Sequence, residues 1–387
     1  MKLALICTEK LTVPPIRGGA IQILIDGVSE HLKKRHQLTI FSISDPELAD
    51  AETRDGIEYV RFPRGNYVFE VARELARRSA KEQRFDLIHV FNRPANTLIY
   101  KSAMPDSRMV VSLHNEMFHE QKISTEMGKL AVRAVDRIMT VSDYIGGTIV
   151  SRFPMAKSKV QTVYSGVRLE DYRPVWTEAA QAVRRRMRER YGLGEEKVVL
   201  FVGRLSEVKG PHVLLQAMEH VAVKHRDAVL VIVGSKWFSD EGMNDYTRHL
   251  RALAERLGED RVRFTGFVPP KQLPDHYAMG DIFVCASQWN EPLARVHYEA
   301  MAAGLPIITT RRGGNAEVIR HEINGLVIDD YANPLAFAAA IDRLLSHPAE
   351  ARRMARTGRE MAESRFGFEH VALRLEHLYR AAMRRRK

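Results

Sequence analysis

Short apolar runs alternate with longer amphipathic stretches along this chain, and that rhythm limits its possible folds more than any other feature. Parallel strands buried on both faces give such continuous runs, because helices cover both sides of their sheet. In the first half the runs are residues 3–7, 38–42, 59–62, 87–90, 109–113 and 137–141. In the second half they are residues 198–202, 228–233, 262–265, 282–285, 307–310 and 325–328. Two such sets predict an α/β chain with two doubly wound domains.

Amphipathic stretches at residues 20–34, 70–81 and 175–191 predict helices, and a last helix is expected over 368–385. The strand rhythm is interrupted between residues 164 and 197, so we expect the domain boundary there. Ligands of open parallel sheets bind beyond the carboxyl ends of the strands, and two such domains that face each other would form a cleft. The turns after the strands are therefore the places to search for chemistry.

The 387 residues include 59 Lys and Arg against 48 Asp and Glu, a formal net charge of +11. Basic residues cluster at 184–188 and 384–387, and aromatic residues do not alternate with them as they do on a stacking surface for single-stranded nucleic acid. Solvated helix faces and a basic tail are the favoured interpretation, with no nucleic-acid partner. Membrane contact is expected to be peripheral at most.

Cys7 and Cys285 lie inside apolar runs far apart in the sequence, which argues against a disulfide framework or a zinc site and suits a reducing compartment. The first residues lack the long apolar segment of a signal peptide. No stretch approaches the ~18 apolar residues of a membrane span. These features predict a soluble, cytoplasmic protein.

Glu291 and Glu299 stand eight positions apart, and Pro292 suits the first turn of a helix that we expect to begin there. The amides of residues 293–295 would then be unpaired and could meet an anion or a polar ligand. Carboxylates that accept two hydroxyls suit a sugar or a ribose. Two ordinary helix acids explain the spacing equally well.

A glycine and two cations follow the apolar run 198–202: Gly203 and Arg204 come first, and Lys209 and Gly210 close the loop. Glycine allows close backbone approach, arginine offers a fork of donors and lysine a point charge, so the loop could clamp a diphosphate. It lacks the glycine and hydroxyl positions of a P-loop. An exposed basic turn is the alternative.

Two glycine pairs also follow strands: Gly18 and Gly19 in the first half, and Gly313 and Gly314 in the second. Either pair could bring bare amides to phosphate oxygens, although an isolated pair is usually only a turn. Neither fits the dinucleotide-binding pattern G-x-G-x-x-G.

His114 follows the run 109–113 and could contact a reacting group. For His114, as for His297, a hydrogen-bonded structural histidine is the alternative. The acidic residues show no strong metal-ligand spacing, which predicts no metal site.

The order of these signals resembles glycosyltransferase family 4, and residues 291–306 look like the central signature of that family. The resemblance covers essentially the whole chain. It implies the GT-B fold: two Rossmann-like domains that face a cleft, with the last helix crossing back onto the first. An acceptor-side domain would comprise residues 1–170 with 366–387, and a nucleotide-sugar-binding domain residues 171–365. At closer range, residues 17–22, 114–118, 234–238 and 289–299 resemble the spore coat protein SA group.

The family resemblance implies a role for each candidate. Arg204 and Lys209 would hold the donor diphosphate and stabilise its charge as it leaves, without a metal. Glu299 would bind the nucleotide ribose and Glu291 the hydroxyls of the donor sugar. The other donor-facing residues would be Gly203, Leu293, Ala294, Arg295, Gly313 and Gly314. Gly18 and Gly19 would lie near the phosphates and the acceptor, and His114 near the transferred sugar.

The implied activity is a retaining, hexosyltransferase-like transfer from a nucleoside-diphosphate sugar, with UDP as the default, to a hydroxyl of a glycan, small molecule or lipid. No other cofactor is expected. Spore coat or cell-envelope polysaccharide is the implied product, with spore coat proteins as partners. The chain departs from the family pattern at Leu293-Ala294, where Phe-Gly is common, and at Ser165-Gly166-Val167, where Asn-Gly-Val is usual.

Three alternatives stay open. The first is a structural spore coat protein that kept the fold and lost the activity. The second is a peripheral membrane enzyme with a lipid acceptor. The third is a sugar epimerase of the same fold, which would need catalytic carboxylates in the first domain that the sequence does not reveal.

Overall fold

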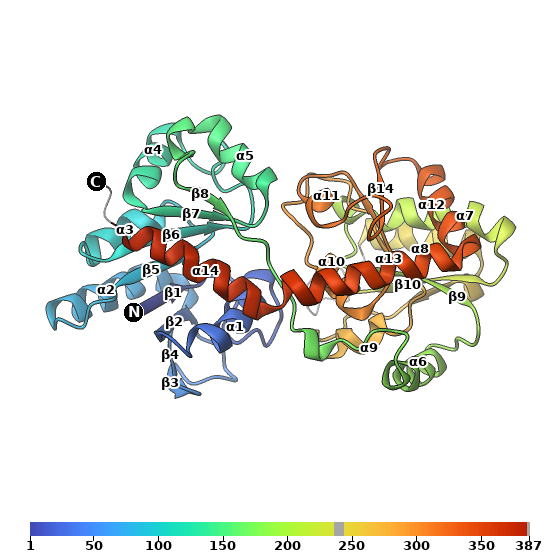
Figure 1. Cartoon of the computed structure of the whole chain (residues 1–387), viewed down its shortest axis with the longest axis horizontal. Helices are drawn as coiled ribbons and strands as arrows, with labels where there is room; N and C mark the ends of the chain where they lie inside the picture. Colours follow the sequence, from blue (N-terminus) through green and yellow to red (C-terminus); the bar gives the residue numbers. More distant parts are fainter. Residues whose placement is uncertain (236–243, 385–387) are drawn as a thin grey trace. The chain divides into compact units, whose positions relative to one another are not determined.

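A computed structural model describes residues 1–235 and 244–384, and the chain divides into two compact units (Figure 1). Unit 1 comprises Met1–Gly166 and Phe368–Lys387, and unit 2 comprises Val167–Gly367. The sequence predicted the two crossings a few residues away, after residues 170 and 365. The Val167 amide donates to the Phe366 carbonyl at 2.8 Å, so the two crossings of the chain lie side by side.

Unit 1 is an eight-stranded sheet in the order β3-β4-β2-β1-β5-β6-β7-β8. All neighbours pair in parallel except β3 and β4, which form an antiparallel pair. The strands are β1 (Lys2–Ile6), β2 (Gln37–Ile43), β3 (Ala51–Arg54), β4 (Ile57–Phe62), β5 (Leu87–Phe91), β6 (Arg108–Leu113), β7 (Arg137–Thr140) and β8 (Val160–Thr162). The α-helices are α1 (Ala20–Leu32), α2 (Tyr67–Ala80), α3 (Asn96–Ala103), α4 (Thr125–Ala134), α5 (Asp143–Arg152) and α14 (Phe368–Met383).

Unit 2 is a six-stranded, wholly parallel sheet in the order β11-β10-β9-β12-β13-β14. Its strands are β9 (Lys197–Val202), β10 (Ala228–Val233), β11 (Val262–Phe264), β12 (Ile282–Cys285), β13 (Ile307–Thr310) and β14 (Leu326–Ile328). Its α-helices are α6 (Glu178–Arg190), α7 (Pro211–Lys224), α8 (Asp245–Leu257), α9 (Leu273–Tyr277), α10 (Val296–Ala303), α11 (Asn315–Val318), α12 (Pro334–Ser346) and α13 (Pro348–Met361).

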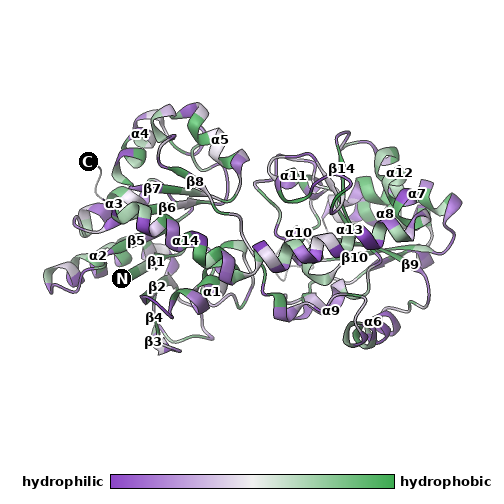
Figure 2. Cartoon of the chain, viewed as in Figure 1, coloured by the Kyte–Doolittle hydropathy of each residue, from purple (hydrophilic) through white to green (hydrophobic). Residues whose placement is uncertain are grey.

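The two parallel sheets confirm the predicted α/β architecture. Every predicted apolar run forms a strand, and Figure 2 shows β6 and β7 as mainly hydrophobic, whereas α13 and α14 alternate hydrophobic and hydrophilic residues. Two strands were not predicted. β3 is a polar, largely exposed edge strand, and β8 has the sequence Val-Gln-Thr, so neither strand contains an apolar run.

The last helix belongs to unit 1, as the sequence analysis predicted. Phe368 lies against α1 at Gly27, where a Cβ atom would come within 2.3 Å of the phenyl ring. Farther along α14, Tyr379 lies 2.8 Å from Nδ1 of His89 on β5. Glycine at position 27 therefore makes room for the returning helix.

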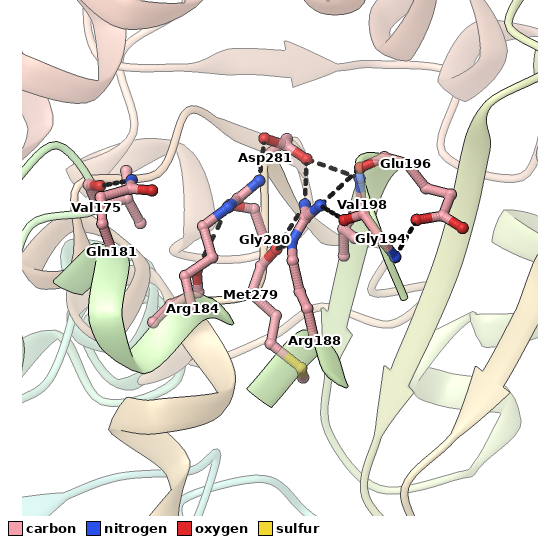
Figure 3. A network of polar contacts seen from close by, with 11 residues as sticks. Val175, Gln181, Arg184, Arg188, Gly194, Glu196, Val198, Met279, Gly280 and Asp281 are labelled. Atoms are coloured by element: carbon pink, nitrogen blue, oxygen red, sulfur yellow. Dashed lines mark hydrogen bonds and ion pairs between the residues drawn. The ribbon is translucent and has the colours of Figure 1, made fainter. Parts of the chain in front are cut away.

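The arginine cluster of α6 was predicted to be a solvated helix face, and this prediction is wrong for Arg184 and Arg188 (Figure 3). Both guanidinium groups bind Asp281, at 2.6 and 2.9 Å. Arg188 also donates to the carbonyls of Met279 and Gly194, and it is almost completely buried. The carboxylate of Asp281 further accepts the amide of Val198, so these arginines fasten α6 to the sheet. Of the second basic cluster, residues 385–387 lie outside the described part of the chain.

Candidate functional site

The loop after β9 is held close to the rest of unit 2 by glycines. Gly210 has a φ of +71°, and a Cβ there would lie 2.0 Å from the carbonyl oxygen of Ala286. Gly234 has a φ of +137°, and a Cβ there would lie 2.0 Å from the carbonyl of Gly203. Only glycine fits two such approaches. The loop therefore presses against the turn after β12, with Arg204 half-buried within it.

That close approach brings Lys209 to Glu291. The Lys209 Nζ lies 2.6 Å from Oε2 of Glu291, which also accepts Trp289 Nε1 at 2.8 Å and Ser287 Oγ at 3.0 Å. Glu291 is 7% exposed. Burial favours its neutral form, but the Lys209 charge and the three hydrogen bonds outweigh burial and hold the pKa of Glu291 below its usual value. The site thus contains an ionised carboxylate beside an ammonium group.

The second glycine pair of unit 2 lies at this carboxylate's backbone. Gly314 donates its amide to the carbonyl of Glu291 at 2.8 Å. Gly313 has a φ of +57°, and a Cβ there would lie 2.0 Å from the same carbonyl oxygen. The prediction of a bare amide is therefore wrong for Gly314. Its amide is hydrogen-bonded to the carbonyl of Glu291 and fixes the backbone there.

The helix predicted to begin at Pro292 begins at Val296 instead. The intervening turn is bound to the start of α11, since the Ala294 amide donates to Oδ1 of Asn315 at 3.3 Å. Long-range bonds of this kind replace the local bonds of a first helical turn. Glu299 consequently lies in the first turn of α10 rather than two turns into a helix, and the amide of Ala294 is paired.

Glu299 lies in its own buried setting, with 6% of its surface exposed. Tyr277 of α9 donates its hydroxyl to Oε2 at 2.9 Å, and Arg295 Nη2 lies 3.5 Å from Oε1. Arg295 was among the residues predicted from the sequence, whereas Tyr277 was not. Ser287 and Trp289 beside Glu291 were not predicted as site residues either. Their types and positions gave no separate signal, because they read as ordinary residues next to a strand.

His297 is a structural histidine, in keeping with the simpler of its two interpretations. It is fully buried, with Nδ1 at 2.9 Å from the carbonyl of Ala294 and Nε2 at 2.8 Å from Oγ1 of Thr309. Both ring nitrogens are thereby occupied, and the ring joins α10 to β13.

In unit 1 the candidate residues follow β1 and β6. Gly18 and Gly19 have φ values of +83° and +100°, and Gly19 directly precedes α1 as expected. A Cβ at Gly19 would lie 2.2 Å from Oε1 of Gln22, whose amide group donates to the carbonyl of Leu11 at 3.2 Å. The glycine pair therefore forms a tight turn against the first helix.

His114 is positioned by the neighbouring strand β5. Its amide donates to Oδ1 of Asn92 at 3.0 Å, and its ring stacks with Phe91 at a centroid distance of 5.9 Å. Phe91 stacks in turn on the buried ring of His89, at 4.2 Å. Burial, and to a lesser extent the charge of His114, lowers the pKa of His89 to about 3. His89 is therefore a neutral support within this ring stack.

The structure thus brings Lys209, Glu291, Gly313 and Gly314 together, whereas Arg295 and Glu299 form a second cluster with Tyr277. Among residues 1–235 and 244–384, no group of three or more His, Cys, Asp or Glu side chains could hold a metal ion. No helix in the same part of the chain is long and apolar enough to span a bilayer. Lys236, Trp237 and Phe238, which contributed to the closer resemblance, lie outside the described residues.

Two family models match this chain in succession. Residues 19–171 match Glycosyltransferase Family 4, and residues 183–361 match glycosyl transferases group 1. A putative glycosyltransferase of Bacillus subtilis, YtcC, is 51% identical over 383 residues, covering 99% of this chain and 93% of the relative. Spore coat protein SA of the same organism is 51% identical over 379 residues, covering 98% and 99%.

Solved structures share the fold at low identity. Anabaena HepE in complex with UDP has a TM-score of 0.77 and 20% identity, covering 98% of this chain and 100% of its own. A glycosyltransferase from Rickettsia africae has a TM-score of 0.81 and 18% identity, covering 100% and 99%. The two Rossmann-like units are those of the GT-B fold.

Proposed function

Because the chain belongs to glycosyltransferase family 4, we propose that it transfers a hexose, with retention of configuration, from a nucleoside-diphosphate sugar to a hydroxyl acceptor. UDP is the nucleotide to test first, since structures of Anabaena HepE hold UDP and UDP-glucose. Spore coat or cell-envelope polysaccharide is the proposed product. The name of the 51% identical spore coat protein SA supports an association with the coat. We propose a cytoplasmic location for the enzyme itself.

The single observation that carries this proposal is the Lys209–Glu291 pair, with its 2.6 Å separation in a buried setting. In a nucleoside-diphosphate sugar, phosphate oxygens and sugar hydroxyls occupy adjoining parts of one ligand. A cation beside an ionised carboxylate offers complementary partners to both parts. We assign Lys209 and Arg204 to the diphosphate, Glu291 to the sugar hydroxyls and Glu299 to the ribose.

In the proposed reaction the bond between the sugar C1 and the diphosphate oxygen breaks, and the acceptor oxygen bonds to C1 on the same face. The acceptor proton passes to the departing diphosphate. Lys209 and Arg204 stabilise the charge that develops on that diphosphate, a contribution that is often the largest in such sites. We assign no protein nucleophile, and His114 is proposed to contact the transferred sugar. With two cations in this role, we propose that activity persists in the presence of a chelator.

Thermal unfolding with UDP, ADP, GDP and their sugar derivatives tests the donor site. A ligand at one hundred times its dissociation constant adds about 2.7 kcal/mol to the free energy of unfolding. We expect one nucleotide series to raise the melting temperature of the wild type, and Glu299→Ala to abolish that rise. The nucleotide that binds then selects the donors for a transfer assay.

The name of spore coat protein SA also favours a second candidate, a structural coat protein without activity. Absence of binding by every nucleotide would support that candidate against the enzyme. An enzyme with a lipid acceptor is separated from both by flotation with anionic liposomes, because it should float with them and transfer sugar to their lipid.

A further inference from the structure

Tyr277 is a buried tyrosine whose hydroxyl has a charged partner. Its Oη donates to Oε2 of Glu299 at 2.9 Å, and the residue is fully buried at the end of α9. Arg295 lies 3.5 Å from the other carboxylate oxygen. Each oxygen of Glu299 thus has a protein partner on a different side, and the plane of the carboxylate is fixed.

Two aromatic rings fix the direction of the Tyr277 hydroxyl. Tyr172 contacts the Tyr277 ring edge to face, with centroids 5.8 Å apart. Phe283 of β12 lies against it with a tilted ring at 5.7 Å. Close packing on this scale leaves a buried ring little freedom to turn its hydroxyl elsewhere.

The phenol keeps its proton at any working pH. Burial first, and then the negative charge of Glu299, raise the pKa of Tyr277 well above its ordinary value. The hydroxyl is therefore a permanent donor. Since a carboxylate offers about four acceptor positions, the contacts from Tyr277 and Arg295 leave about two of them available for the hydroxyls of a ligand.

We infer that Tyr277 is a positioning residue, which holds the carboxylate of Glu299 in the orientation that receives both hydroxyls of the nucleotide ribose. The inference rests on the proposed function, in which Glu299 binds that ribose. Orientation fixed before binding reduces the entropy lost when the ligand arrives. Tyr277 touches the carboxylate and not the reacting atoms, so it acts on donor binding rather than on the chemical step.

The test compares nucleotides with and without the ribose hydroxyls. Tyr277→Phe keeps the packed ring and removes only the hydroxyl. The dissociation constants of UDP, ADP and GDP, each beside its 2′,3′-dideoxy counterpart, are measured by calorimetry. For the nucleotide that binds the wild type, we expect Tyr277→Phe to weaken binding about tenfold, since hydrogen bonds to charged groups are the stronger class. Tyr277→Phe should change binding of the dideoxy counterpart less than about threefold. This nucleotide lacks the ribose hydroxyls, so it makes no hydrogen bond to Glu299 that the substitution could weaken.

Tyr191→Phe is the matched control. The Tyr191 hydroxyl lies 2.9 Å from Nε2 of His276, which precedes Tyr277 on α9. The control therefore removes a phenol hydroxyl that contacts the same helix, and it leaves the bond between Tyr277 and Glu299 in place. It should leave both nucleotide affinities unchanged. In the transfer assay, Tyr277→Phe should raise the donor KM with little change in kcat.

Each outcome discriminates. Equal weakening of the natural and dideoxy nucleotides, or unchanged binding of both, overturns the positioning role and leaves the proposed function intact. Failure of the wild type to bind any nucleotide overturns the proposed function, and this inference with it.

Discussion

The two units hold their candidate site residues by different means. In unit 2 charged groups do this: Lys209 binds the buried Glu291, and elsewhere in the unit Arg188 binds Asp281, which directly precedes β12. In unit 1 the holding groups are rings, and His114 stacks on Phe91. One substitution removes a charge completely, whereas the remaining rings of a stack can shift to fill the space of a smaller side chain. Unit 2 should therefore respond to charge deletion, and unit 1 to changes in a neutral, packed interior.

The largest effect on stability is expected at Arg188. Arg188→Ala leaves Asp281 paired with Arg184 and the Val198 amide, but it removes the donor to the carbonyls of Met279 and Gly194. A buried acceptor left unsatisfied costs about 1–3 kcal/mol. Chemical denaturation measures that loss. Arg186→Ala is the control on the same helix, because Arg186 is 65% exposed and pairs with Asp275 at 2.8 Å. An exposed pair is worth about 0–1 kcal/mol. Equal losses in the two variants would contradict a special role for the buried charge.

Lys209 should show the next largest effect, on turnover. Lys209→Ala removes charge stabilisation of the departing diphosphate, and the loss of one such group costs about 100-fold or more in kcat. Stability should fall as well, because Glu291 loses its ion partner. The double variant Lys209→Met with Glu291→Gln should regain stability but not turnover, which separates the two losses. Activity of Lys209→Ala or Arg204→Ala within about threefold of the wild type, ~0.7 kcal/mol, would remove these residues from the proposed role.

The smallest of these effects should appear at His89 in unit 1, and only in acid. Burial holds its pKa at about 3 in the folded chain, against an ordinary value of 6.5. The unfolded chain takes up this proton first, so the free energy of unfolding falls as the pH drops from 6.5 towards 3, by up to about 1.4 kcal/mol per pH unit. Denaturation at pH 7 and pH 5 should give a smaller loss for His89→Gln than for the wild type. An equal loss of stability in His89→Gln and the wild type would contradict the role of His89. His377 is exposed, so His377→Gln serves as the control and should lose as much stability as the wild type.

The sheets could be predicted from the sequence because a buried parallel strand leaves a local signal. The first residue of α10 could not be predicted, because the turn before this helix is held by a bond from the Ala294 amide to Asn315, 21 positions away. The same limit applies to Arg188, whose partner Asp281 is 93 positions away, and a mostly charged helix therefore looked solvated.

Within the site, Lys209 was recognisable as a candidate because glycines flank its loop after the run 198–202. Glu291 and Glu299 were recognisable by their spacing of eight positions and by the resemblance of residues 291–306 to the family signature. Their pairing was not recognisable, since it depends on glycines that let two turns approach. Tyr277 gave no signal, because a tyrosine before a buried strand has the pattern of an ordinary core residue. The roles assigned to these residues stay predictions until the variants are measured.

The return of α14 to unit 1 has a consequence for how the protein is made. Tyr379, the partner of His89, is synthesised 290 residues after it, and Phe368 reaches Gly27 only when nearly the whole chain exists. On the ribosome, unit 2 is complete while the first-made unit still lacks its last helix. Until that helix emerges, the apolar surface around α1 and His89 stays uncovered, so the first domain to begin folding is the last to finish.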